Sequence, residues 1–93
     1  MTISVLLPAA LASYAGGRRE ITVEGGTTTI AGLLDRLAVQ EPALERRLRD
    51  ELGRVRRHVN LYVDNVDVRT LEDDQTPVPE GAAVHVLGAI SGG

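Results

Sequence analysis

Few side chains of this sequence are suited to catalysis or metal binding. Cysteine and lysine are both absent, which excludes thiol nucleophiles, thiolate metal sites and Schiff-base chemistry. His58 and His85 each alternate with apolar residues, and no carboxylate stands at ligand spacing from either, so we expect both to face solvent or an interface. Ser91 has no nucleophile motif around it and no obvious base. The side chains therefore offer no conventional catalytic centre and no metal site.

The remaining candidate is the carboxylate that follows Gly92 and Gly93. Two glycines give a backbone without side chains, which can pass through a channel that any Cβ would block. Residues 89–93 reach about 15 Å when extended. A terminal carboxylate with a pKa of about 3.5 is ionised and inert at pH 7, so it must first be activated, most simply as a mixed anhydride with AMP. We therefore expect Gly92 and Gly93 to act inside the active site of another protein.

Composition limits the environment and the partners. The net charge is −3 and the isoelectric point is 5.3, with no Trp or Phe, so nucleic acid is an unsuitable partner. No apolar run approaches the roughly 20 residues that cross a bilayer. The N-terminal segment "MTISVLLPAALASYA" lacks a leading basic residue and is interrupted by Pro8, unlike a signal peptide. We expect a cytoplasmic protein without a membrane partner.

Alternating apolar residues predict an antiparallel hairpin at the start of the chain. The segment 2–7 places Ile3, Val5 and Leu7 on one face, and a second alternating segment covers residues 18–24. The residues between them begin with proline and close on two glycines, so they predict a loop with at most one helical turn.

Two helices are expected next. Thr28 or Thr29 caps the first, which ends near Glu41 because Pro42 disfavours helical geometry in the residue before it. The second covers residues 42–52, with Gly53 as its C-cap. The apolar residues at helical spacing are Ile30, Leu33, Leu34 and Leu37 in the first helix, and Leu44, Leu48 and Leu52 in the second.

The last part of the sequence predicts three more strands. Residues 59–63 alternate, Asp64–Asn65 forms a tight turn, and Val66 and Val68 belong to a short returning strand. A polar, proline-bearing connection leads to a final strand at 82–90, and it is long enough to return to the sheet centre.

This order of elements predicts an α+β fold of the β-grasp (ubiquitin-like) type. We expect a mixed sheet of four to five strands packed on one main helix plus a short second helix, with the other sheet face towards solvent. Residues 1–88 would form the domain and residues 89–93 a flexible C-terminal tail. From the pattern of elements alone, a ferredoxin-like α+β arrangement remains the competing interpretation.

Several segments, taken in order, resemble the ThiS/MoaD family of sulfur carrier proteins, which are β-grasp relatives of ubiquitin. They are "GGRREITVEGGTTTIAGLLDRL", "PALERRL", "VNLYVDNVDVR" and "TPVPEG…VHVLGAISGG", the last ending in the paired glycines. Within the family the similarity is greatest to the CysO-type carriers of cysteine biosynthesis, and next to the small subunit of molybdopterin synthase. One departure is Leu87–Gly88–Ala89, where the family commonly has a proline before the tail.

The resemblance implies a protein cosubstrate and not an enzyme. An E1-like adenylating enzyme would use ATP and Mg²⁺ to adenylate Gly93, and a sulfurtransferase or sulfide would then replace AMP to leave a thiocarboxylate. A sulfur-accepting biosynthetic enzyme would take the sulfur, and no cofactor would be bound to the carrier itself. Two other hypotheses stay open: a ubiquitin-like protein modifier, and a β-grasp interaction module. The receiving pathway also stays open.

The expected partner surface is the solvent-facing side of the sheet together with the tail. Its predicted residues are Leu6, Tyr62, His85 and Leu87 on the sheet, Arg69 from the family's "DVR", and Ala89, Ile90 and Ser91 in the tail.

Two charged segments have two interpretations each. "GRVRRH", with Arg54, Arg56 and Arg57, is either a soluble lead-in to a strand or a docking patch. The acidic run 72–74 is either solvated or a contact for a basic partner.

Overall fold

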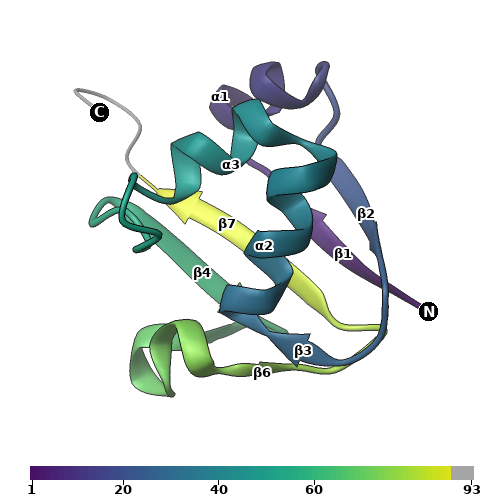
Figure 1. The fold of residues 1–93 in the computed structure, drawn as a ribbon, viewed down its shortest axis with the longest axis vertical. Helices are drawn as coiled ribbons and strands as arrows, with labels where there is room; N and C mark the ends of the chain where they lie inside the picture. The colour runs from purple at the N-terminus through teal and green to yellow at the C-terminus, as the bar shows by residue number, and fades with distance from the viewer. Residues whose placement is uncertain (89–93) are drawn as a thin grey trace.

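The computed structural model describes residues 1–88, and its centre is a five-stranded sheet (Figure 1). The strand order is β2-β1-β7-β4-β5. The bounds are β1 (Thr2–Leu6), β2 (Glu20–Glu24), β4 (Val59–Val63), β5 (Val66–Asp67) and β7 (Ala83–Gly88).

The final strand lies in the middle of the sheet, as its long preceding connection suggested. β7 runs parallel to β1 and antiparallel to β4, whereas β1 and β2 form the predicted antiparallel hairpin. A central parallel pair flanked by two hairpins is the β-grasp arrangement, so the predicted fold is confirmed and the ferredoxin-like alternative is excluded. Asp64 and Asn65 both have positive φ (48° and 75°) and form the predicted turn between β4 and β5.

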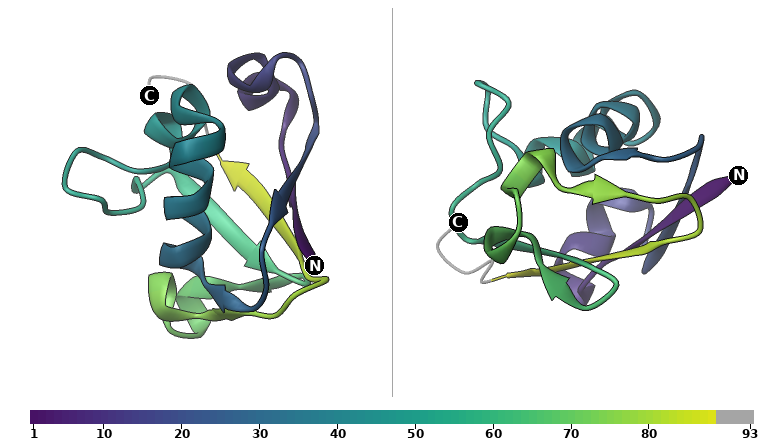
Figure 2. Two further views of the ribbon diagram at one scale, coloured as in Figure 1. Left: turned by 45° about the vertical axis from the view of Figure 1, so that its right-hand side comes forward. Right: turned by 90° about the horizontal axis from the view of Figure 1, so that it is seen from below.

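The helices cover one face of the sheet (Figure 2). The main helix, α2 (Ile30–Gln40), begins at Thr29, whose side-chain oxygen accepts a hydrogen bond from the Gly32 N–H at 3.1 Å. The second helix is α3 (Pro42–Leu48). The loop after β1 holds a short helix, α1 (Ala9–Ala12), and the 3₁₀ turn η1 (Ser13–Ala15).

The second helix is shorter than predicted. It ends at Leu48, and Leu52 is 71% exposed instead of sharing a buried face with it. The Asp50 Oδ1 atom accepts hydrogen bonds from the N–H groups of Leu52 and Arg54, and Arg49 pairs with Val55 in an isolated bridge. Asp50 thus gives the backbone a turn in place of a further helical turn, and residues 49–58 form a projecting loop (Figure 2).

The polar connection before β7 contains structure that the sequence pattern did not predict. Val68 belongs to the 3₁₀ turn η2 (Val68–Thr70) and not to the returning strand. A further 3₁₀ turn, η3 (Asp73–Gln75), follows. β6 (Pro77–Val78) then pairs with β3 (Thr28–Thr29) as a separate two-stranded sheet.

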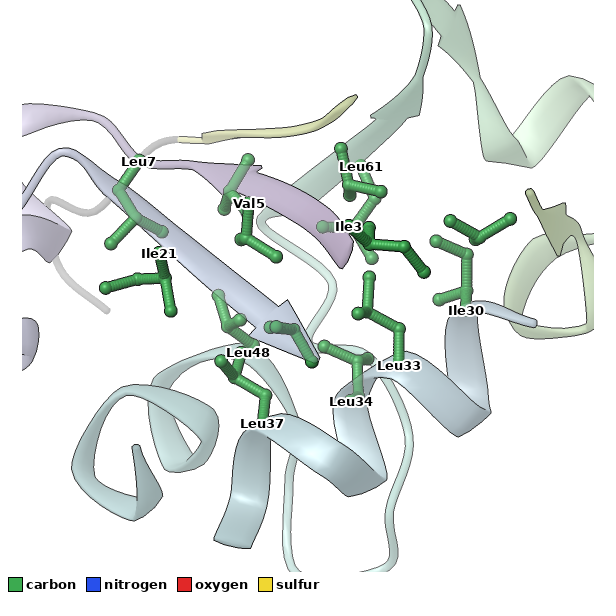
Figure 3. Packing of buried hydrophobic residues seen from close by; sticks show 14 of the residues in the cluster. Ile3, Val5, Leu7, Ile21, Ile30, Leu33, Leu34, Leu37, Leu48 and Leu61 are labelled. Carbon is green, nitrogen blue, oxygen red and sulfur yellow. The ribbon is translucent and has the colours of Figure 1, made fainter. Parts of the chain in front are cut away.

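The core is aliphatic and lies between the sheet and the helices (Figure 3). The strands contribute residues such as Ile3, Val5 and Leu61, each at most 2% exposed. Figure 3 shows the four predicted apolar residues of α2 and Leu48 of α3 directed into this core. Leu44 of α3 is also fully buried. Within residues 1–88, no helix is long and apolar enough to span a bilayer.

Candidate functional site

The strand register brings three of the predicted partner residues into one row across the sheet. Leu6 of β1 and Tyr62 of β4 are both paired with His85 of β7. Leu87 lies two positions further along β7, opposite Asn60, and is 49% exposed. We call Leu6, Tyr62, His85 and Leu87 the open face. They come from three strands, and the sheet gathers them on the side that carries no helix.

Alternation explains why these residues share a side. In a strand, successive side chains point to opposite faces, so burial of Val84 and Val86 under α2 turns His85 and Leu87 the other way. Leu6, Tyr62 and His85 are half-buried by their neighbours in the sheet. The result is a mixed surface of aliphatic, aromatic and imidazole groups, of the kind found at protein interfaces.

A hollow of about 320 Å³ opens at the end of this face, where β1 and β7 finish. Leu6, Pro8 and Leu87 give it apolar walls, and Arg19 adds a guanidinium whose Nε donates to the Leu7 carbonyl at 2.8 Å. Sequence reasoning missed Pro8 and Arg19. The hairpin register could have found Arg19, because it precedes Glu20, the partner of Leu6.

The described chain ends at Gly88, which is paired with Val59, and we call this point the exit because the predicted tail residues follow it in the sequence. A Cβ at Gly88 would lie 2.4 Å from the His58 carbonyl oxygen, so only glycine allows this close approach of the two strands. The described chain is therefore held in strand geometry up to its last residue. The predicted tail residues lie outside the described part: Ala89, Ile90, Ser91, Gly92 and Gly93.

Arg69 lies beside this exit, at the edge of the sheet. Its guanidinium donates to the Asn60 side chain and to the carbonyl oxygens of Arg57 and Val59, the last two at 2.8 and 3.0 Å. These bonds tie η2 to the beginning of β4, the strand that pairs with Gly88. Arg69 thus holds the backbone next to the exit, a role that the sequence did not indicate.

Charge around the loop 49–58 is set by Asp50 and its neighbours. The backbone N–H of Arg54 lowers the pKa of the Asp50 carboxyl below its ordinary value of 3.8, and the N–H of Leu52 and the charges of Arg54 and Arg56 add to this.

The two histidines, His58 and His85, are half-buried. Among residues 1–88, no group of three or more His, Asp or Glu side chains could hold a metal ion.

Comparison with known proteins gives consistent results. The model of the ThiS family matches residues 5–93. Sulfur carrier protein CysO of Mycobacterium tuberculosis is 30% identical over 95 residues, which cover 100% of both chains.

Two solved structures agree in fold. CysO in the BexX/CysO complex of Amycolatopsis orientalis has a TM-score of 0.84 and 26% identity, over 98% of this chain and 99% of that one. SAMP1 from Haloferax volcanii, a small archaeal modifier protein, has a TM-score of 0.81 and 26% identity over 100% of both chains.

Proposed function

The chain belongs to the ThiS family, and from that premise we propose that it is a sulfur carrier protein of the CysO type. The observation that carries the proposal is the 30% identity to CysO over the full length of both chains. The fold supports this proposal, because the open face lies next to Gly88, the residue that precedes the predicted tail.

The chemistry we propose takes place at the carboxylate of Gly93. A carboxylate oxygen attacks the α-phosphorus of ATP on an E1-like adenylating enzyme, and pyrophosphate leaves. Sulfide then attacks the acyl carbon, and AMP leaves. If the donor is instead the persulfide of a sulfurtransferase, its terminal sulfur attacks, AMP leaves, and a thiol reductant cleaves the resulting acyl disulfide. The product is a thiocarboxylate, which is ionised at pH 7 and nucleophilic, as thiolates are.

Delivery of the sulfur completes the cycle. The thiocarboxylate sulfur attacks an electrophilic carbon held by a sulfur-accepting biosynthetic enzyme and forms a new carbon–sulfur bond. Water then cleaves the acyl–sulfur bond and restores the carboxylate of Gly93. The carrier supplies the docking surface and the reacting group, and its partner enzymes supply the catalysis. Cysteine biosynthesis is the receiving pathway that the CysO similarity favours.

Intact-mass measurement tests this proposal. The protein is incubated with its activating enzyme, ATP, Mg²⁺ and sulfide. We expect a gain equal to the mass difference between sulfur and oxygen. A variant lacking Gly93 should fold normally and gain nothing. A wild-type mass that stays unchanged under these conditions would refute the carrier function, and sulfur on the deletion variant would refute the assignment to Gly93.

A second candidate is a protein modifier, which the likeness to SAMP1 favours. A modifier needs the same activation of Gly93 but transfers the acyl group to an amine of another protein. Mass spectrometry of the protein isolated from its own host separates the two. Larger conjugates that contain this chain would identify a modifier, and the sulfur-for-oxygen shift alone would identify a carrier.

A further inference from the structure

Four arginines surround a shallow hollow at the β4 side of the molecule. They are Arg54, Arg56, Arg57 and Arg69, which we call the arginine rim. Val55 and Asp50 complete the lining of this hollow, so four positive charges face one carboxylate. The whole chain has a net charge of −3, and the rim is therefore a local reversal of its overall sign.

The arginine rim lies beside the exit of the tail. Arg57 is two residues before Val59, the partner of Gly88, and Arg69 donates to the carbonyl oxygens of both Arg57 and Val59. In Figure 1 the loop that carries Arg54–Arg57 lies at the same end of the sheet as the end of β7, and Figure 2 shows that the tip of this loop extends away from the sheet. A partner that receives the tail must therefore pass close to these guanidinium groups.

Contacts inside the domain leave most of this charge uncompensated. Arg56 Nε donates to the Arg46 carbonyl oxygen, and Arg69 also bonds to neutral oxygens. Among the described residues, Arg54 forms one ion pair, with Asp50 Oδ2 at 3.5 Å, and its side chain is 72% exposed. Within residues 1–88, Arg57 is exposed and its side chain makes no hydrogen bond or ion pair. Exposed guanidinium groups with neutral partners remain available to an external anion.

The surface next to the arginine rim carries acidic residues, so the charge changes sign along this side of the molecule. A second hollow is lined by the apolar residues Val59, Leu61 and Val68, together with Arg54 and Arg69 of the rim and the carboxylates of Asp73 and Asp74. Asp73 and Asp74 belong to η3, and Figure 1 shows this part of the chain at the opposite end of β4 from the end of β7. The surface therefore changes from positive next to the exit to negative further away. A complementary partner needs its acidic groups close to the pocket that takes the tail.

We propose that the arginine rim docks against an acidic patch beside the mouth of that pocket on the activating enzyme. This inference rests on the proposed function. The arginines are spread over an open surface and do not enclose a small anion, which favours a protein surface over free phosphate. The negative net charge and the lack of lysine make nucleic acid the weaker partner.

The test measures charging kinetics of four proteins as cosubstrates of the activating enzyme, at low and high salt. They are the wild type, Arg54→Gln/Arg57→Gln, Arg54→Lys/Arg57→Lys and the matched control Arg18→Gln/Arg36→Gln. The control removes the same net charge next to β2, at the opposite edge of the sheet. Circular dichroism and thermal unfolding establish that each variant is folded.

We expect the rim glutamine variant to raise KM about three- to tenfold at low salt with kcat unchanged, because rim charges act mainly on association. The difference should shrink at high salt, and the lysine variant and the control should stay close to wild type. Equal KM values for the rim and control variants would overturn the proposal. So would rim-dependent binding of duplex DNA or inorganic phosphate with unchanged charging. A wild type that is never charged would instead refute the proposed function.

Discussion

The two faces of the central sheet are made by the same strands but have different environments. On the helix side, Val84 and Val86 are each 1% exposed, whereas Leu87 on the open face is 49% exposed. Successive residues of β7 thus alternate between the core and the surface. If the open face binds the partner as proposed, stability and partner binding depend on separate residues of one strand, and substitutions should affect one property without the other.

The largest effect is expected at the terminal glycines, which are outside the described residues 1–88. Replacing Gly92 by valine should abolish charging, because a β-branched side chain does not fit a channel shaped for bare backbone. The free energy of unfolding of this variant, measured by thermal denaturation, should stay within about 0.5 kcal/mol of the wild-type value. Intact-mass measurement after incubation with the activating enzyme provides the readout. Full charging of this variant would remove the channel argument.

On the helix side, Leu37→Ala should lower the free energy of unfolding by about 3 kcal/mol, because it opens a cavity beneath α2. Leu37 is fully buried. Urea denaturation followed by circular dichroism measures the loss. The folded fraction should be charged at the wild-type rate, and a slower rate would show that the two faces are coupled.

Gly88 is the last described residue of β7 and precedes the predicted tail. Gly88→Ala should therefore disturb the end of the sheet from which the tail continues. The new Cβ would lie 2.4 Å from the His58 carbonyl oxygen, so the end of the β4–β7 pair must separate at a cost of about 1–3 kcal/mol. Hydrogen exchange at the Val59 amide and its neighbours should become faster. An unchanged stability would show that the strand pair adjusts without strain.

On the open face, Leu87→Ala should raise KM for charging a few-fold and change the free energy of unfolding by less than about 0.5 kcal/mol. Steady-state charging assays and urea denaturation measure the two quantities. Val39→Ala serves as the control, because Val39 is 87% exposed on α2 and outside this face. If Leu87→Ala and the control give the same KM, the open face is not the docking surface.

The smallest effect concerns the loop 49–58. The pKa of the Asp50 carboxyl should lie below 3.8. The Asp50→Asn variant should therefore have a slightly lower free energy of unfolding than the wild type near neutral pH. A depressed pKa means that the carboxylate stabilises the fold above its unfolded pKa and loses this contribution as the pH falls through the folded pKa. NMR titration of the side-chain carboxyl carbon measures the value. A pKa at or above 3.8 would contradict the turn geometry.

Local patterns predicted most of the fold. Alternation identified β1, β2, β4 and β7, and a cap at Thr28 or Thr29 with the four apolar residues of α2 identified the main helix, for which the structure selects Thr29. The open face followed from the same alternation, because the residues not needed for the core point the other way. Each of these features depends on residues that are close together in the sequence, so local patterns are sufficient to predict it.

The missed features depend on contacts between distant residues. The β3–β6 pair has two residues in each strand and joins positions far apart in the sequence, so no periodicity can indicate it. Helix α3 was extended too far because Leu52 continued its apolar spacing, whereas the Asp50 side chain redirects the backbone first. Arg69 and Arg19 acquire their roles only when the fold brings backbone carbonyls to their guanidinium groups.

The position of β7 has a mechanical consequence. An enzyme that took up the tail as proposed, in line with β7, would pull along the axis of this strand. β7 is bonded on both sides, with five paired positions on β4 and three on β1. A pull along the strand loads these pairs together in shear, whereas a pull at an edge strand would peel them apart one at a time. We therefore expect the domain to stay folded when a partner pulls on the C-terminal end of β7.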